Sequence, residues 1–495
     1  MKTRSIHFII IVFIFTSASC HPNRLKTSEK ELEKEIITQE KAKNEAERIA
    51  LEKQKSEAPI NLPAGSCFKE IRYVDPQNPP VSLDILGTSK NTREIKLSDI
   101  ASSIRYVKLE TPPDTSLLYE PFHYRDDLMS TISSDGEQII YQGIYGLSCF
   151  DMAGKYLETV WKNESGIVHN GGGIMITNFF GVSPIIPVSL SEGNLHFFFE
   201  DGPGGNGFVM KYKPGTEKGI NLQPNNELKS QLQIPGDTLF NTNKIFSDRF
   251  DRIFGVSPGL WTGINNKWNA GKSGVLLVTY NDSGDTLCKF TDYERIANFG
   301  QSTWRHSVGL QSYYYEGSLT IKSEYNDTIF RLIPPNRLLP VYIIDFGKLK
   351  VNFMEGLNPD IDLSGKYLLN SLHESDNFLF IRYTKNQDSP NNRRKNTVKF
   401  FNTLFDKKQG KLFDQPGFTL LPEGILNDLD GGIPFWPEFI TPQGEMMKLV
   451  SGKNIKDYIN SESFTKGPAT SDQRRKQVSL TNGLKDRDMI IMIVK

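Results

Sequence analysis

The chain has 495 residues, 38% of them hydrophobic, so it is long enough for one large domain with a sizeable core or for several smaller ones. Its 58 Lys and Arg residues balance 58 Asp and Glu residues, and this zero net charge argues against a dedicated nucleic-acid-binding protein, which has a basic excess. The 31 Phe, 18 Tyr and 40 Gly residues favour strands and turns over helices.

The first nineteen residues predict an export signal. Lys2 and Arg4 precede the apolar run "IHFIIIVFIF", which is shorter than the roughly 20 residues that a membrane-spanning helix needs. The small residues "SAS" then lead directly into Cys20, although an ordinary secretory cleavage site has no need of a cysteine there. The segment resembles the lipobox of bacterial lipoproteins, in which this cysteine is acylated and becomes the mature N-terminus. A secreted protein with an incidental cysteine is the alternative.

Lipidation of Cys20 would attach the protein to a membrane, because several acyl chains on one residue hold a protein far more firmly than one chain. The residues that follow, "HPNR", lack the acidic cluster that surface-exported lipoproteins of some bacteria carry at this place. We therefore expect an outer-membrane protein that is lipid-anchored through Cys20 and faces the periplasm. Exposure at the cell surface is the alternative.

A charged helical stalk is expected within residues 20–59. Residues 26–57 are dense in Glu and Lys and contain no Gly, Pro or aromatic residue, and Ser28 with Glu31 fits a capping box. The few apolar residues are too irregularly spaced for sustained heptads, so a solvated spacer is favoured over a coiled-coil dimerisation helix. Residues 60–92 are expected to form a linker or extra strands.

One local pattern recurs in the rest of the chain: a strand, a polar turn with Gly or Asp, and a second strand. Each copy is typical of a β-hairpin. Repeats of antiparallel strands predict an all-β fold, a β-propeller of four-stranded blades. Five hairpins and one blade shared between the chain ends predict six blades over residues 93–495. The copies are "GLSCFDMAGKYLETV", "FVMKYKPGTEKGINL", "LLVTYNDSGDTLCKF", "SEYNDTIFRLI" and "VKFFNTLFDKKQGKLF".

The two ends of this region predict how the ring closes. Residues 93–111 supply strands before the first hairpin, and residues 486–495, "DRDMIIMIVK", finish the chain with a nearly uniform apolar run. A propeller must join its last blade to its first or leave open sheet edges. We therefore expect backbone pairing within one sheet between a strand from about residues 93–130 and strands from the last 80 or so residues.

Several motifs together resemble a known family. They are "IKLSDIASSIRYVKLETP", "YNDTIFRL" followed by "LPVYIIDFGK", "LPEGILNDLDGGIPFWP" and the terminal "DRDMIIMIVK". In this order they are similar to the six-bladed β-propeller lipoproteins of unknown function that are common in Gram-negative anaerobes. The resemblance covers residue 93 to the end and the lipobox. It implies the fold and the lipid anchor, and it supplies no assigned catalytic residue.

Two motifs that match ligand-binding loops by letter fail in context. "GPGGNG" at 202–207 fits a dinucleotide-binding loop, but the strand-like "FVMKYKPG" follows where that site needs a helix, so a hairpin loop is expected. "NDLDGG" at 427–432 would place Leu426 and Pro437 at the ends of an EF-hand loop, so a tight polar turn is expected. We expect no metal site and no cofactor.

Three cysteines remain besides Cys20. Cys67, Cys149 and Cys288 have no spacing typical of a zinc site, and the sequence does not decide whether any two form a disulfide. Cys149 and Cys288 lie in strand-like runs and are expected to be small buried hydrophobic residues.

The sequence offers two groups of candidate ligand-binding residues. His123 with Asp126 and Asp127 forms the best acid–base cluster, although a solvated loop between blades is the favoured explanation. Trp261, Trp268 and Trp304 lie among Gly, Asn and Ser, so they are expected in loops, where they could stack on sugars or peptides or wedge between blades.

Two functional hypotheses from different classes follow. The first is a non-catalytic binding or scaffolding module whose loops present one face to an unknown protein, peptide or glycan. The alternative is an enzyme, a hydrolase or lyase with a site at one mouth of the central channel. Propellers serve both purposes, so the fold does not decide between them. No catalytic residue can be named from the sequence.

Overall fold

A computed structural model of the chain divides into two compact units, Met1–Ala58 and Pro59–Lys495. All the residues that the structure describes lie in the second unit, so the signal segment, Cys20 and the expected stalk lie outside them. The described residues are 68–72, 74, 77–87, 94–113, 132–143, 146–162, 168–170, 173–175, 186–191, 194–200, 207–212, 237–241, 252–257, 260–264, 274–281, 285–292, 311–323, 325–352, 355–356, 361–386, 397–418 and 424–495.

Within the described residues, strands that follow one another in sequence pair antiparallel and build four sheets of four strands and a two-stranded ribbon. The first sheet is β3 (Ile132–Ser134), β4 (Gln138–Gly143), β5 (Gly146–Asp151) and β6 (Tyr156–Lys162). The ribbon is β7 (Val168–Asn170) and β8 (Gly173–Met175). The next sheet is β9 (Ile186–Ser191), β10 (Asn194–Glu200), β11 (Gly207–Tyr212) and β12 (Asp237–Asn241). The third is β13 (Arg252–Ser257), β14 (Leu260–Ile264), β15 (Val275–Asn281) and β16 (Thr286–Thr291), and the fourth is β21 (Tyr367–Glu374), β22 (Phe378–Lys385), β23 (Lys399–Asp406) and β24 (Lys411–Phe418).

Two further sheets combine distant segments. The five-stranded sheet joins β1 (Val81–Asp84) in parallel to β20, in the order β1-β20-β19-β18-β17. The closing sheet has the order β2-β27-β26-β25. Their strands are β17 (Gln311–Tyr315), β18 (Ser318–Lys322), β19 (Thr328–Ile333), β20 (Arg337–Asp345), β2 (Ile104–Lys108), β25 (Phe439–Ile440), β26 (Met446–Ser451) and β27 (Met489–Val494). The 3₁₀ turns η1 (Leu97–Asp99) and η4 (Gly347–Leu349) lie in connections.

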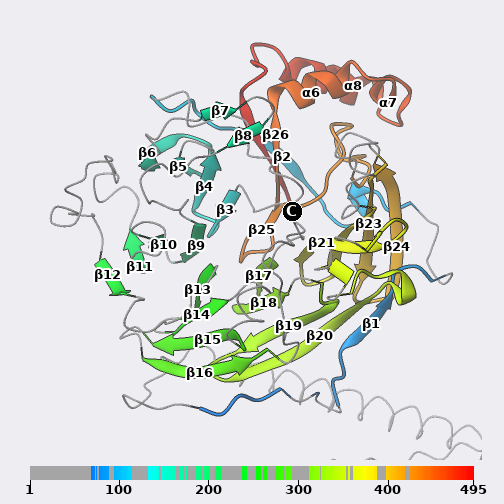
Figure 1. The fold of residues 1–495 in the computed structure, drawn as a ribbon. Coiled ribbons are helices and arrows are strands. Elements are labelled where there is room, and N and C mark those ends of the chain that lie inside the picture. Colours follow the sequence, from blue (N-terminus) through cyan, green and yellow to red (C-terminus); the bar gives the residue numbers. More distant parts are fainter. Residues whose placement is uncertain are drawn as a thin grey trace, which may run out of the picture. The chain divides into compact units, whose positions relative to one another are not determined.

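Each sheet contacts the next one along the chain. β3 lies against β9, β9 against β13, β13 against β18, β17 against β21, and β21 against β25. An apolar cluster then joins the closing sheet back to the β3–β6 sheet. The sheets are therefore arranged as a β-propeller (Figure 1), and the prediction of an all-β propeller fold is confirmed.

The ring closes as predicted, by strands from the two ends of the domain. β2 pairs antiparallel with β27, with Ile104 opposite Val494 and Lys108 opposite Ile490. β27 also pairs with β26 on its other side. The C-terminal strand is therefore an inner strand of its sheet, hydrogen-bonded on both edges, and β2 covers the edge that it would otherwise expose.

The apolar run "MIIMIV" is explained by burial of both faces of β27. Side chains alternate across a strand. Met489, Ile491 and Ile493 belong to the cluster shared with the β3–β6 sheet. The alternate residues Ile490, Met492 and Val494 belong to the cluster shared with the β21–β24 sheet. A strand that is buried on both faces has no polar positions, so its sequence shows no alternation.

Four of the five predicted hairpins are present, as the pairs β5–β6, β15–β16, β18–β19 and β23–β24. The turns of two of them place Gly154 and Gly410 at positive φ, which suits glycine because it has no Cβ. In the remaining copy the first strand is β11, but its partner is β12, much further along the chain. The expected second arm, "GINL", lies outside the described residues.

Part of the segment 60–92 runs along the outer strands of two neighbouring sheets. The backbone N–H of Phe68 donates to the carbonyl of Leu287 in β16, and Ile71 forms a bridge with Arg337 in β20. β1 then adds to the outer edge of β20, and the nearby Leu83 and Ile85 are buried. This segment therefore covers a sheet edge that the blade alone would leave open.

Three helices between β26 and β27 depart from the all-β expectation. They are α6 (Gly452–Ile459), α7 (Glu462–Lys466) and α8 (Ser471–Leu480). A hydroxyl at each N-cap accepts a hydrogen bond from a backbone N–H in the first turn, which is the usual way to start a short polar helix. These pairs are Ser451 with Asn454, Ser461 with Phe464, and Thr470 with Gln473. No helix in the described part of the chain is long and apolar enough to cross a membrane.

Candidate functional site

The structure places only one of the sequence-predicted ligand-binding residues. Trp261 lies in β14, where it pairs with Gly255 of β13 and Tyr280 of β15. The expectation that it lies in a loop is therefore wrong: Gly263 is itself a residue of the strand, and Asn265 and Asn266 follow its end. His123, Asp126, Trp268, Trp304 and the lipidation residue Cys20 all lie outside the described residues.

The structure describes one of the two rejected ligand-binding motifs in full, and only Gly207 and the flanking strands of the other. The glycine-rich 202–207 segment connects the hairpin strands β10 and β11, and Glu200 pairs with Gly207 at the start of the second strand. In the 427–432 segment, Asp428 accepts hydrogen bonds from the backbone N–H and the hydroxyl of Ser98. The "NDLDGG" turn therefore uses a carboxylate to hold the η1 segment in place.

Cys149 and Cys288 are free thiols with 0% exposure, so the prediction that they are buried hydrophobic residues is confirmed. Burial raises the pKa of Cys149 to about 12, and nearby carboxylates add to this effect. The thiol is therefore protonated and unreactive at neutral pH. Cys67 lies outside the described residues.

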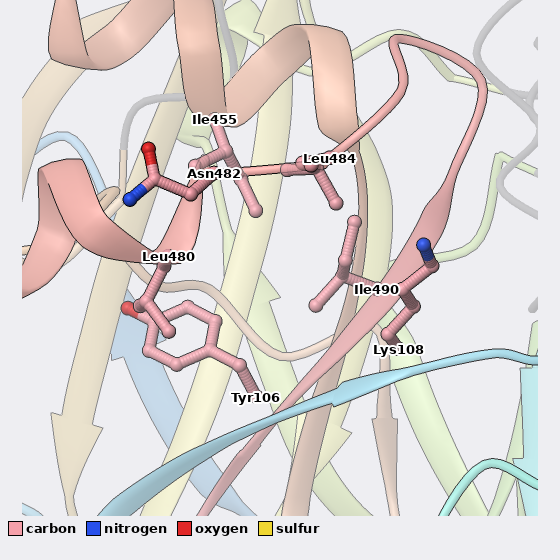
Figure 2. Close-up of a pocket in the computed structure, with 8 residues that line it drawn as sticks. Tyr106, Lys108, Ile455, Leu480, Asn482, Leu484 and Ile490 are labelled. Carbon is pink, nitrogen blue, oxygen red and sulfur yellow. The ribbon is translucent and has the colours of Figure 1, made fainter.

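A small pocket lies between the helical insertion and the closing sheet. It has a volume of about 170 Å³. Figure 2 shows apolar side chains from α6, α8 and β27 around its centre, with the ring of Tyr106 from β2 below them. Its wall therefore depends both on ring closure and on the insertion. The lining residues are Tyr106, Lys108, Ile455, Leu480, Asn482, Gly483, Leu484 and Ile490.

The hydroxyl of Tyr106 is engaged outside the pocket. It lies 3.3 Å from Asp430 Oδ1, to which it donates, and in Figure 2 it is directed away from the pocket centre. Burial raises the pKa of Tyr106 well above its usual value, and the charge of Asp430 adds to this. The "NDLDGG" turn thus fixes the ring of Tyr106, which presents an apolar face to the pocket.

Lys108 is the charged residue in the pocket lining. Its Nζ lies 2.7 Å from Asp488 Oδ2, and the side chain of Lys108 is half exposed. Burial alone would raise the pKa of Asp488, but hydrogen bonds from Lys108 and the backbone of Lys485 outweigh it and lower the pKa. Asp488 is therefore ionised at neutral pH and holds Lys108 at one end of the pocket.

A buried ionic cluster lies where the β17–β20 and β21–β24 sheets meet. Glu374, whose side chain is 1% exposed, accepts from Arg331 at 2.6 Å and from Lys407 at 2.7 Å. The hydroxyls of Tyr313 and Tyr342 also donate to it, at 2.9 and 2.7 Å. Four donors use the lone pairs of this carboxylate, so the cluster joins two sheets and leaves little capacity for proton transfer to a substrate.

A second polar group lies on the other face of the β21–β24 sheet, towards the closing sheet. Arg382 donates to Asn402 at 3.3 Å, and Lys448 donates to the carbonyl of Pro434 at 2.6 Å. Burial lowers the pKa of Lys448 to about 8; Glu438 opposes this and Arg382 adds to it. Burial, with a contribution from Arg382, lowers the pKa of His373 to about 3, so this imidazole is neutral at physiological pH.

No group of three or more His, Cys, Asp or Glu side chains among the described residues could hold a metal ion. The pocket and both charged clusters were missed by the sequence reasoning. The helical insertion had a signal, because Ser451 with Asn454 and Thr470 with Gln473 form capping boxes. The clusters had none, because their members are far apart in sequence.

A family model described as a domain of unknown function, DUF4933, matches residues 63–461. The chain belongs to this family. No curated protein matches the chain. Among solved structures, it is similar to a member of the DUF4221 family from Bacteroides vulgatus, with 10% sequence identity and a TM-score of 0.38. That match covers 80% of this chain and 97% of the other. So low a TM-score carries no argument about function.

Proposed function

We propose that this DUF4933 protein is a lipid-anchored β-propeller that acts as a binding or scaffolding module in the cell envelope. In this proposal Cys20 is acylated, the charged segment 26–57 is a helical spacer, and the propeller lies on the periplasmic side of the outer membrane. The proposal counts the five four-stranded sheets and the five-stranded sheet of the described residues as six blades. The support for the anchor is the sequence "SASC" behind a short apolar run.

The observation that carries the binding role is the pocket under the helical insertion. Of the described residues that line it, four are aliphatic, and Lys108 is already paired with Asp488. Pockets of this kind suit binding of an apolar group. A hydrolase or lyase would need a catalytic acid or base that is accessible to its substrate, and Glu374 is not available for that role. Glu374 is saturated by four donors inside a sheet junction, and it supports packing rather than chemistry.

The anchor is tested by Cys20→Ala, with Cys67→Ala as the matched control. We expect Cys20→Ala to move the protein from the membrane fraction to the soluble fraction and to abolish incorporation of labelled fatty acid, while Cys67→Ala changes neither. Unchanged membrane association and mass for Cys20→Ala would refute lipidation.

The binding role is tested by cross-linking the wild-type protein in intact cells and purifying it from solubilised membranes. A defined partner or ligand should accompany it in near-stoichiometric amount. Leu480→Gln, which changes the pocket wall, should reduce that recovery. Val478→Gln should not, because Val478 has matched exposure on the same helix and does not line the pocket: Leu480 is 45% exposed and Val478 46%. Recovery of the wild-type protein alone would count against a binding or scaffolding role.

A further inference from the structure

The pocket between α6, α8 and the β2–β27 pair has the size and the polarity of a site for one kind of ligand. We propose that it binds small carboxylic acids that carry an apolar group about as large as one aromatic ring, with the ring inside and the carboxylate at Lys108. This inference rests on the proposed binding function and names the ligand class of that site.

The volume sets the size of the apolar group. The pocket measures about 170 Å³, and an apolar cavity of about 150 Å³ accepts a benzene-sized molecule. Ile455, Leu480, Leu484 and Ile490 surround the space in Figure 2, and Tyr106 contributes the face of its ring. Burial of one ring would therefore replace water at five apolar side chains, which is the main source of affinity for such a ligand.

One edge of the pocket is a turn at a glycine that borders open space. Gly483 lines the pocket at φ +75°, and a Cβ built at this residue would meet nothing within 4 Å. A larger residue would be strained at this φ and would project into open space. The neighbouring Asn482 is exposed and also lines the pocket, with its amide directed away from the centre in Figure 2. The turn that follows α8 therefore leaves room for a ligand to enter.

The charges at one end of the pocket favour an anion. Lys108 carries three N–H donors, and Asp488 accepts one of them. Asp488 also interacts with the charge of Lys485, so two lysines face one carboxylate there. The local excess of one positive charge attracts a carboxylate and repels an amine. A half-exposed lysine also pays a smaller desolvation penalty on ion pairing than a buried one.

The test uses the purified full chain and four probes that separate the two parts of the ligand. 3-Phenylpropionate has both the ring and the carboxylate, 3-phenylpropanol lacks the charge, phenethylamine has the opposite charge, and propionate lacks the ring. In saturation-transfer NMR and titration, 3-phenylpropionate should bind most tightly and 3-phenylpropanol more weakly. Phenethylamine and propionate should show little or no binding. No saturation transfer to 3-phenylpropionate, or tighter binding of phenethylamine, would overturn the proposal.

Variants locate the binding. Leu480→Gln should lower the affinity for 3-phenylpropionate roughly tenfold, because one apolar side chain of the pocket wall is lost. Val478→Gln should leave that affinity unchanged. Lys108→Met should lower the affinity for 3-phenylpropionate roughly three- to fivefold, as expected for loss of an exposed ion pair. The affinity for 3-phenylpropanol should not change. Equal affinity for 3-phenylpropionate in wild type, Leu480→Gln and Lys108→Met would place the ligand elsewhere and refute the inference.

Failure of the ligand proposal can be distinguished from failure of the proposed binding function. If the wild-type protein is recovered from membranes with a partner that depends on Leu480 but 3-phenylpropionate does not bind, the proposed function holds and only this ligand class is wrong. A peptide whose C-terminal residue binds while the free acids do not would also refute the small-acid proposal.

Discussion

The two faces of the closing sheet each pack against a neighbouring sheet, but they bury different kinds of residue. Towards the β3–β6 sheet, the interface is an apolar cluster that includes Val107, Ile139, Phe150 and Ile491. Towards the β21–β24 sheet, an apolar cluster is accompanied by the buried Lys448 and by Arg382. The first interface combines apolar burial with hydrogen bonds to backbone groups, such as that from Gln443 to the carbonyl of Asp135. The second also contains a buried lysine, so it depends on protonation as well. The difference predicts which side of the closing sheet responds to pH.

The largest effect is expected from removing the strand that both interfaces share. Deletion of residues 488–495 removes six buried apolar side chains and uncovers β2 and β26 together. We expect aggregated or protease-sensitive protein without a cooperative unfolding transition, measured by limited proteolysis and calorimetry. A soluble truncated chain that unfolds cooperatively would show that neither interface is needed for closure.

Single truncations on the two faces of β27 compare the apolar parts of the interfaces. Ile491 and Met492 are both 0% exposed and point to opposite sides. Ile491→Ala and Met492→Ala should each lower the free energy of unfolding by about 3 kcal/mol, because each leaves a cavity in a packed core. Denaturant titrations at pH 7 measure this. A loss below about 1 kcal/mol for one of them would show that its side of the sheet is loosely packed.

Lys448→Met separates the two interfaces. The pKa of Lys448 is lowered to about 8 in the folded protein, so between that pH and its ordinary pKa of 10.5 the unfolded chain binds more protons. The free energy of unfolding should therefore rise with pH across this window. Below pH 8, burial of the charged Lys448 lowers the free energy of unfolding of the wild type by about 3 kcal/mol. The variant avoids this loss, but it also loses the hydrogen bond to Pro434, which stabilises the wild type by about 1 kcal/mol.

We therefore expect Lys448→Met to be about 2 kcal/mol more stable than wild type at pH 7 and to lack the alkaline rise. Denaturant titrations from pH 7 to 10.5 check both. Leu449→Ala, at the adjacent position of β26 on the other face, is the control: it should lower stability without changing the pH dependence. Identical pH profiles for wild type and Lys448→Met would remove the electrostatic distinction between the interfaces.

His373 predicts a smaller effect on the acid side. Its pKa is lowered to about 3, so between pH 6.5 and pH 3 the unfolded chain binds more protons and stability falls as the pH falls. Discounted for the partial exposure of the ring, the loss between pH 7 and pH 5 should be about 1 kcal/mol. His373→Phe should unfold with the same free energy at both pH values. A loss in this variant equal to that of wild type would assign the acid sensitivity to other groups.

The smallest effect is expected from a change outside both interfaces. A chain that begins at residue 62 lacks the charged segment 26–57, which has too little apolar surface to join a core. Its melting temperature should lie within a few degrees of that of the full mature chain, as measured by calorimetry. A large decrease would mean that the segment packs on the propeller.

The sequence predicted the parts of the fold that local patterns specify. Alternating strands with turn residues predicted four of the five hairpins, and the apolar run of residues 486–495 predicted the strand that closes the ring. It did not predict that β12 replaces the expected second arm after β11, because a partner that is distant in sequence leaves no local signal.

The candidate site was much less predictable. The pocket joins Tyr106 and Lys108 to residues 455–490, and only ring closure brings these segments together. The helical insertion was missed because α8 is polar almost throughout, so the apolar periodicity that indicates a helix is weak there. Trp261 was assigned to a loop because neighbouring residues outweighed the short strand "LWTGI". Glu374 and its partners were unpredictable because five separate strands or strand ends supply them.

Hydrogen exchange at the backbone amides of β27 tests the closure of the ring most directly. Residues 489–494 pair with β2 on one side and with β26 on the other, and every side chain of the strand is buried. These amides should therefore exchange only through global unfolding, as slowly as the central strands β15 and β22. Exchange of residues 489–494 that is faster by orders of magnitude, while β15 and β22 stay protected, would contradict the account.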